Sequence, residues 1–175
     1  MQFDVMFTGH RPPRLGGYDE DNPTAAKVRD WLMKKVAQKI AEGAKTFVSG
    51  GALGVDQWGA QAVIDRDAEL TMAIPCDGYC SRWPQASQDK FNEILKKAHV
   101  VEVVCLGTYA SYKNIVRDKW MVERSKEVIA VWNGAEDGGT WHTIKEARKA
   151  GRRIDILNPV DFSERTENEQ PNGQE

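Results

Sequence analysis

The stretch Ser49-Gly50-Gly51-Ala52-Leu53-Gly54-Val55-Asp56 follows a short apolar run at 45–48 and leads into a helical pattern that starts near Val55. Glycines at a strand-to-helix corner let bare backbone N–H groups approach an anion, because no Cβ stands in the way. The stretch therefore predicts a phosphate-binding corner formed by Ser49, Gly50, Gly51 and Gly54.

A second corner of the same kind follows later in the chain. Residues 128–132 are apolar and predict a buried strand. This strand is followed by Asn133-Gly134, by Asp137-Gly138-Gly139-Thr140 and by a helical run at 141–150. In an open parallel sheet, ligands bind beyond the carboxyl ends of the strands, so both corners are expected to face one pocket. Gly138, Gly139 and Thr140 are predicted to contact phosphate, with Thr140 also capping the helix.

Neither corner has a standard nucleotide-binding fingerprint. The first lacks the Lys-Ser/Thr pair that ends a P-loop, and the spacing of Gly50, Gly51 and Gly54 is not that of a dinucleotide site. An ordinary kinase or dehydrogenase is therefore disfavoured. The alternative is that these glycines only form tight turns and allow close helix–strand packing.

Short apolar runs alternate along the chain with longer runs of helical periodicity, which predicts an α/β fold: a Rossmann-like parallel sheet with helices on both faces. Strands are expected at 3–8, 45–49, 70–74, 100–104, 128–132 and 154–157. Helices are expected at 24–42, 55–67, 87–98, 112–125 and 140–150. One domain at 1–160 accounts for all of them. From Ser163 onward no large apolar residue occurs, so 163–175 is expected to be a disordered tail.

Composition narrows the function classes. A formal net charge of −2 on 175 residues gives no basic footprint for duplex DNA, whereas a small anionic ligand is compatible with a local cluster of arginines. Cys76, Cys80 and Cys105 lack the spacing of a metal site, so we expect reduced thiols, no metal and no cofactor. Without an apolar signal core or an 18-residue apolar run, a cytoplasmic protein with no membrane contact is predicted.

Several motifs together resemble one family. They are Thr8-Gly9-His10-Arg11-Pro12 with Leu15-Gly16-Gly17, the stretch 50–56, Arg117 with Trp120-Met121-Val122, and Gly138-Gly139-Thr140. From about residue 3 to 158 the chain resembles the YpsA-like branch of the SLOG superfamily, which also includes the Lonely Guy phosphoribohydrolases and the DNA-processing protein DprA. The resemblance implies a Rossmann-like nucleotide-binding fold.

The Lonely Guy site carries over only in part. Arg117, four positions before Met121, is similar to the catalytic arginine of that family, and Asp137-Gly138-Gly139-Thr140 is similar to its glycine corner without the preceding proline. The catalytic glutamate is missing, because Thr143 stands at its position. The resemblance therefore implies a hydrolase-like site in this chain that lacks the glutamate which serves as acid/base in that family.

Asp56 is the best substitute among the carboxylates. Cleavage of an N-glycosidic bond needs a carboxylate that stabilises the oxocarbenium-like centre or orients water, and Asp56 lies just past the first corner. Asp137 is the second choice, and Glu146 is one helical turn further from the ligand. The alternative for Asp56 is a residue of the first helical turn that the helix dipole favours.

The loop after the first expected strand supplies further candidates. Thr8, Gly9, His10 and Arg11 are predicted to contact the ligand, with Arg11 neutralising phosphate together with Arg117. His10 is compatible with a general acid, a base-stacking group or a packed loop residue, and the packed loop residue is favoured among the three. Trp58, Trp83 and Trp141 are candidates for base stacking, although each is also compatible with core packing.

The leading hypothesis is recognition of a nucleoside phosphate or an ADP-ribose-like nucleotide, with hydrolysis of its N-glycosidic bond as a candidate reaction. In that reaction Asp56 and Arg117 are the catalytic candidates. One alternative is a non-catalytic nucleotide sensor, which the missing glutamate favours. Another is a single-stranded DNA-binding protein resembling DprA, which the net charge disfavours. Apolar helices that contain tryptophan are compatible with a homo-oligomer.

Overall fold

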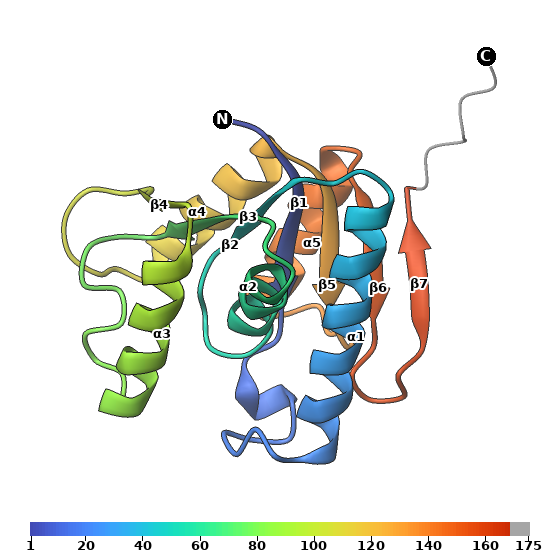
Figure 1. Ribbon diagram of the computed structural model, residues 1–175, viewed down its shortest axis with the longest axis horizontal. Helices are drawn as coiled ribbons and strands as arrows, with labels where there is room; N and C mark the ends of the chain where they lie inside the picture. The colour runs from blue at the N-terminus through green and yellow to red at the C-terminus, as the bar shows by residue number, and fades with distance from the viewer. Residues whose placement is uncertain (169–175) are drawn as a thin grey trace.

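The computed structural model describes residues 1–168 and contains a seven-stranded sheet in the order β4-β3-β2-β1-β5-β6-β7 (Figure 1). Six strands are parallel and only β7 runs antiparallel to its neighbour. The strands are β1 (Phe3–Gly9), β2 (Thr46–Ser49), β3 (Glu69–Ile74), β4 (Val100–Val103), β5 (Ser125–Val131), β6 (Arg153–Leu157) and β7 (Glu164–Glu167).

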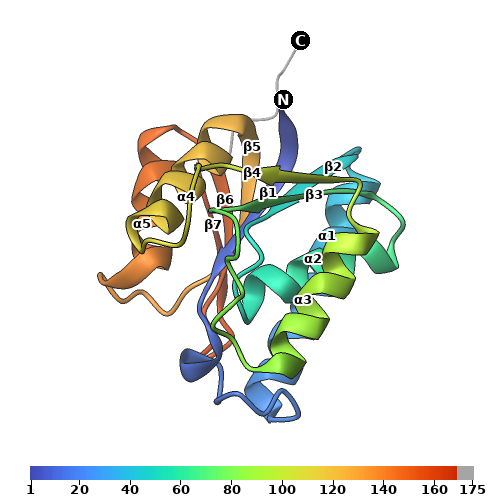
Figure 2. The ribbon, with the colours of Figure 1, turned by 90° about the vertical axis from the view of Figure 1, so that its left-hand side faces the viewer.

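Helices cover both faces of the sheet. They are α1 (Pro23–Ala41), α2 (Val55–Asp65), α3 (Gln85–Lys97), α4 (Tyr112–Arg124) and α5 (Gly138–Lys149), and a short 3₁₀ turn, η1, spans Pro12–Arg14. Figure 2 shows α1, α2 and α3 on one side of the sheet and α4 and α5 on the other. The predicted fold class is therefore confirmed, and each expected helix and strand is present within a few residues of its expected bounds.

The strand order places a topological switch point between β1 and β5. From β1 the chain builds the sheet outward through β2, β3 and β4, then returns beside β1 with β5 and continues to β6 on the opposite side. At such a point, consecutive connections leave toward opposite faces and open a crevice beyond the carboxyl ends of the two strands. The fold thus positions a site at the ends of β1 and β5.

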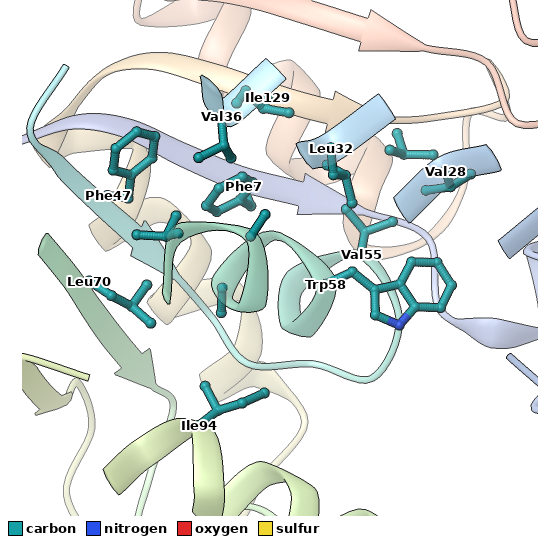
Figure 3. Packing of buried hydrophobic residues seen from close by; sticks show 14 of the residues in the cluster. Phe7, Val28, Leu32, Val36, Phe47, Val55, Trp58, Leu70, Ile94 and Ile129 are labelled. Atoms are coloured by element: carbon teal, nitrogen blue, oxygen red, sulfur yellow. The ribbon is translucent and has the colours of Figure 1, made fainter. Parts of the chain in front are cut away.

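The larger of two apolar clusters lies under α1, α2 and α3. Figure 3 shows Phe7 of β1 between Val36 and Leu32 of α1 and the residues of α2, with all three labelled side chains fully buried. Apolar positions at helical spacing give α1 this face, and the side chain of Asn22 caps the helix by accepting a hydrogen bond from Ala25 N at 2.8 Å.

A second cluster lies under α4 and α5. It joins Met6 of β1, Val128 and Ala130 of β5, Met121 of α4 and Ile144 of α5. Both faces of β1 and β5 are therefore covered, so the middle of the sheet is buried between two layers of helices.

The predicted disordered tail is wrong for residues 164–167, which form β7. Strand β7 contains no apolar residue, so its sequence has no hydrophobic pattern that would predict a strand. Backbone pairing to β6 and polar contacts hold it in place. Thr166 Oγ1 donates to Asp155 Oδ1 at 2.9 Å, and Arg148 donates two hydrogen bonds to the carboxylate of Glu167. The rest of the expected tail, residues 169–175, lies outside the described residues.

Candidate functional site

A cavity of about 320 Å³ lies at the switch point, beyond the ends of β1 and β5. Its walls come from four segments: the end of β1 with the loop that follows, the start of α2, one face of α4, and the start of α5. The lining residues are Phe7, Thr8, Gly9, His10, Arg11, Pro13, Arg14, Ala52, Asp56, Asn114, Ile115, Arg117, Asp118, Asp137, Gly138, Gly139 and Thr140.

The second glycine corner opens directly into this cavity. Helix α5 begins at Gly138, and Asp137 at its N-cap makes no side-chain capping hydrogen bond. A Cβ built on Gly138 or Gly139 would meet no atom within 4 Å, so the backbone here borders empty space. The N–H groups of the first helical turn are therefore available to an anion.

Thr140 lies in this first turn, and the prediction that it caps the helix is wrong. The cap position belongs to Asp137, three residues earlier, because the helix begins at Gly138. Thr140 is nearly buried and lines the cavity.

The first glycine corner is packed shut. Ser49, Gly50, Gly51 and Gly54 do not line the cavity. A Cβ on Gly50 would lie 2.6 Å from the guanidinium carbon of Arg117, and one on Gly54, whose φ is +92°, would lie 2.8 Å from the carbonyl oxygen of His10. These glycines are required for close packing, and the structure does not bring them to the cavity.

The polar groups of this corner also bond to one another. Ser49 Oγ donates to Asp56 O at 2.7 Å, and Gln57 Nε2 donates to Gly51 O at 3.1 Å. Ala52 N donates to a carboxylate oxygen of Asp56 at 3.3 Å. The corner therefore positions Asp56 at the floor of the cavity.

Asp56 is a buried carboxylic acid with an altered pKa. Burial raises its pKa from 3.8 to about 6, while the positive charge of Arg117 and the hydrogen bond from Ala52 N act in the opposite direction. Near neutral pH it can therefore exchange a proton, which an ordinary aspartate cannot do in that range.

Arg117 lies on α4 and is almost fully buried. Its Nε donates to Asp118 Oδ1 at 2.6 Å, and its Nη1 donates to the carbonyl oxygens of Gly50 and Ala73. The neighbouring carboxylates hold its pKa above the usual range, so it stays charged. Two of its hydrogen bonds, to Gly50 O and Ala73 O, thus tie α4 to the first corner and to β3, although the side chain also borders the cavity.

His10 is fixed between two segments. Its Nε2 accepts a hydrogen bond from Asn133 N at 3.0 Å, and its carbonyl oxygen accepts one from Val55 N. Burial, with the charge of Arg14, lowers its pKa, so the imidazole is neutral. Of its three predicted roles, this bonding favours the packed loop residue. Thr8 and Gly9 line the cavity beside it.

Arg11 and Arg14 are the exposed arginines of the site. Arg11 lines the cavity from the loop after β1, and next to it Arg14 donates to Asp137 Oδ1 at 2.5 Å. Three arginines and three aspartates therefore border the same space: Arg11, Arg14, Arg117, Asp56, Asp118 and Asp137. Of these, Arg11 makes no ion pair among the described residues.

The other candidates lie away from the cavity. Thr143 is buried and donates to Gly139 O at 3.0 Å, so it serves helix α5, and Glu146 does not line the cavity. Trp58 donates to Glu20 at 3.3 Å and packs in the core. Trp141 stacks on Trp132 with ring centroids 5.5 Å apart.

Three polar or charged residues of the cavity were missed by the sequence reasoning: Arg14, Asn114 and Asp118. Asn114 precedes Arg117 by three residues, so helical spacing alone places both on one face of α4. Arg14 could not be found in this way, because it lies in a 3₁₀ turn of three residues, which is too short to show a periodic sequence pattern. The described residues contain no group of three or more side chains placed to hold a metal ion, and no helix among them is long and apolar enough to cross a membrane.

This architecture defines the class: a Rossmann-like α/β protein with an open helix N-terminus at its switch point. A family model, described as the YspA SLOG family, matches residues 5–162. The chain belongs to this family, which confirms the resemblance found in the motifs.

Relatives of similar length share low identity with this chain. The UPF0398 protein of Oceanobacillus iheyensis is 22% identical over 167 residues, which cover 91% of each chain. A UPF0398 protein of Bacillus pumilus is 26% identical over 151 residues, covering 82% of this chain and 80% of the relative.

Two solved structures have a similar fold. DNA processing protein A from Helicobacter pylori gives a TM-score of 0.64 at 19% identity, over 92% of this chain and 68% of the other. DprA from Streptococcus pneumoniae gives 0.61 at 16% identity, over 92% of this chain but only 53% of that longer one. At this identity the likeness concerns the fold alone.

Proposed function

We propose that the cavity binds a nucleoside phosphate, with a phosphate group at the N-terminus of α5. The observation that carries this proposal is the open corner at Gly138 and Gly139, where free helix N–H groups border empty space. Arg11 adds a cation to the lining of the same cavity. Family membership supports a nucleotide as the ligand.

Isothermal titration with adenosine 5′-monophosphate and ribose 5-phosphate tests the proposal. Gly139→Val fills the space where the phosphate would lie, and Arg11→Ala removes the cation. Each variant is expected to weaken binding about tenfold or more, in line with charge-assisted hydrogen bonds of about 1.5–3 kcal/mol. Arg66→Ala is the matched control, because Arg66 is exposed at the end of α2 and borders no part of the cavity. Equal affinities in all four proteins would overturn the proposal.

Hydrolysis of the N-glycosidic bond is the second candidate, and Asp56 favours it. Hydrolysis breaks the bond between C1′ and the base, leaves the electron pair on the base, and adds the hydroxyl of water to C1′. The remaining proton of that water passes to the base. Asp56, with its pKa of about 6, is suited to accept and return this proton.

Chromatography for free base distinguishes the enzyme from a non-catalytic sensor. The enzyme releases base from a bound nucleotide, and Asp56→Asn abolishes release while binding is retained. A sensor binds the same nucleotide and releases nothing over a long incubation at high protein concentration.

A further inference from the structure

A second cavity of about 470 Å³ adjoins the first. Arg11 lines both cavities, and the neighbouring prolines divide between them: Pro12 faces the second cavity and Pro13 the first. The two spaces are thus neighbours across the η1 turn, with one arginine at their boundary.

The walls of the second cavity are aromatic and positive. Tyr18, Tyr79, Trp83 and Tyr109 line it with Arg11 and Arg82, and no carboxylate of residues 1–168 does. The first cavity, by contrast, has three aspartates. Aromatic faces beside arginines suit a planar ring that carries or adjoins negative charge.

Part of this aromatic wall is rigid and part is free. Tyr79 and Trp83 pack edge to face at a centroid distance of 5.1 Å, and both pack against Phe91. Tyr18 is 72% exposed and Tyr109 is 43% exposed. The fixed rings form a floor, and the exposed tyrosines leave ring surface on which a ligand can stack.

We propose that the second cavity holds the base of a nucleoside diphosphate or of its ester, with the phosphate chain crossing Arg11 into the first cavity. This inference rests on the proposed function of the first cavity. A ligand that occupies both spaces carries its negative charge past Arg11, and a diphosphate matches an arginine at this boundary better than a single phosphate.

Tyr18→Ala tests the base site without disturbing the fold, because this side chain is exposed and makes no hydrogen bond among the described residues. Its matched control is Tyr112→Ala, which removes a 61% exposed tyrosine that lines neither cavity. Titration uses adenosine 5′-diphosphate and, as a probe without a base, inorganic pyrophosphate. Tyr18→Ala is expected to weaken binding of the diphosphate about tenfold and to leave pyrophosphate unchanged, since stacking acts on the base alone.

Trp83 offers an independent readout. Stacking of adenine near Trp83 is expected to quench part of the tryptophan fluorescence, and Trp83→Phe, which keeps an aromatic ring in the floor, is expected to remove most of this quenching. Unchanged quenching in this variant would place the base elsewhere.

The outcomes separate the two proposals. If adenosine 5′-monophosphate binds but neither the diphosphate nor pyrophosphate does, the proposed function stands and this inference is wrong; if none of the three binds, the proposed function fails as well. If both bind equally well and Tyr18→Ala changes neither affinity, the phosphate site stands and only the base site is overturned. If an oligothymidylate binds with a dependence on Tyr18 while the diphosphate does not bind, the second cavity is a site for single-stranded nucleic acid and this inference is wrong.

Discussion

The two glycine-rich corners look alike in sequence and differ in what surrounds them. A Cβ added at Gly50, Gly51 or Gly54 would lie 2.6–2.8 Å from another residue, whereas one added at Gly138 or Gly139 would meet nothing within 4 Å. The first corner is filled by Arg117, Phe91 and the loop after β1, and the second opens into a cavity. Glycine thus serves packing at one corner and access at the other.

The two arginines near these corners differ in the same way. Arg117, the candidate taken from family resemblance, donates hydrogen bonds to the carbonyl oxygens of Gly50 and Ala73, so it closes the first corner. Within residues 1–168, Arg11 has no comparable partners, and its side chain remains available beside the open corner. A match to a family motif therefore does not by itself give an arginine its role, because the contacts of the side chain decide whether it can still bind a ligand.

The largest effect is expected for Gly54→Ala. The backbone of Gly54 has φ +92°, and the added methyl group would meet backbone atoms of His10 and Arg11 that cannot move aside. Strain and overpacking together are expected to lower the free energy of unfolding by about 4 kcal/mol. Urea denaturation measures this, and a loss below about 1 kcal/mol would contradict the description of a closed corner.

Arg117→Ala is expected to come next. Its removal leaves two buried carbonyl oxygens and Asp118 without their donor, at a cost of about 3 kcal/mol in the free energy of unfolding. Lys119→Ala, at an exposed position of the same helix, is the control and should change stability little. A stable Arg117→Ala protein that loses only ligand binding would instead place this arginine in the phosphate site.

The pH dependence of stability tests Asp56. In the unfolded chain this carboxyl ionises near pH 4, and in the native state its pKa is about 6, so between these values the native state binds more protons. The contribution of Asp56 to the free energy of unfolding therefore falls as the pH rises through this window, by at most about 3 kcal/mol. Asp56→Asn should gain stability relative to the wild type from pH 4 to pH 7. A difference that does not vary with pH would mean that the pKa is not raised.

The smallest effect on folding is expected for Gly139→Ala. The methyl group would enter empty space, and alanine suits a helix better than glycine, so the free energy of unfolding should stay within about 0.5 kcal/mol of the wild type or rise slightly. Chemical denaturation checks this. Loss of more than about 1 kcal/mol would show that the second corner is also packed, and the contrast between the corners would disappear.

Much of the fold could be predicted because the apolar residues of the helices and buried strands recur at helical and strand spacing in the sequence. Val28, Leu32 and Val36 recur at helical spacing and form the buried face of α1. Strand β7 was missed because it is exposed and entirely polar: an edge strand can be held by backbone pairing and by contacts such as Arg148 with Glu167, which leave no hydrophobic pattern.

The candidate site was only partly readable for a related reason. The motifs around Gly9 and Gly139 led to cavity residues, because the carboxyl ends of parallel strands meet at one edge of the sheet. The same rule could not tell that Gly50 lies under Arg117, or that Arg14 reaches Asp137 from 123 residues away in the chain. Side-chain contacts between distant segments have no local signature.

The sequence by itself determined the α/β class, the order of its elements and the two glycine corners, since these depend on local periodicity and on backbone freedom. Only the tertiary structure decided which corner is open, which arginine is free, and how far the environment raises the pKa of Asp56. These properties depend on which side chains fill the space above a corner and how much water they exclude, and both are set by packing between segments far apart in the chain.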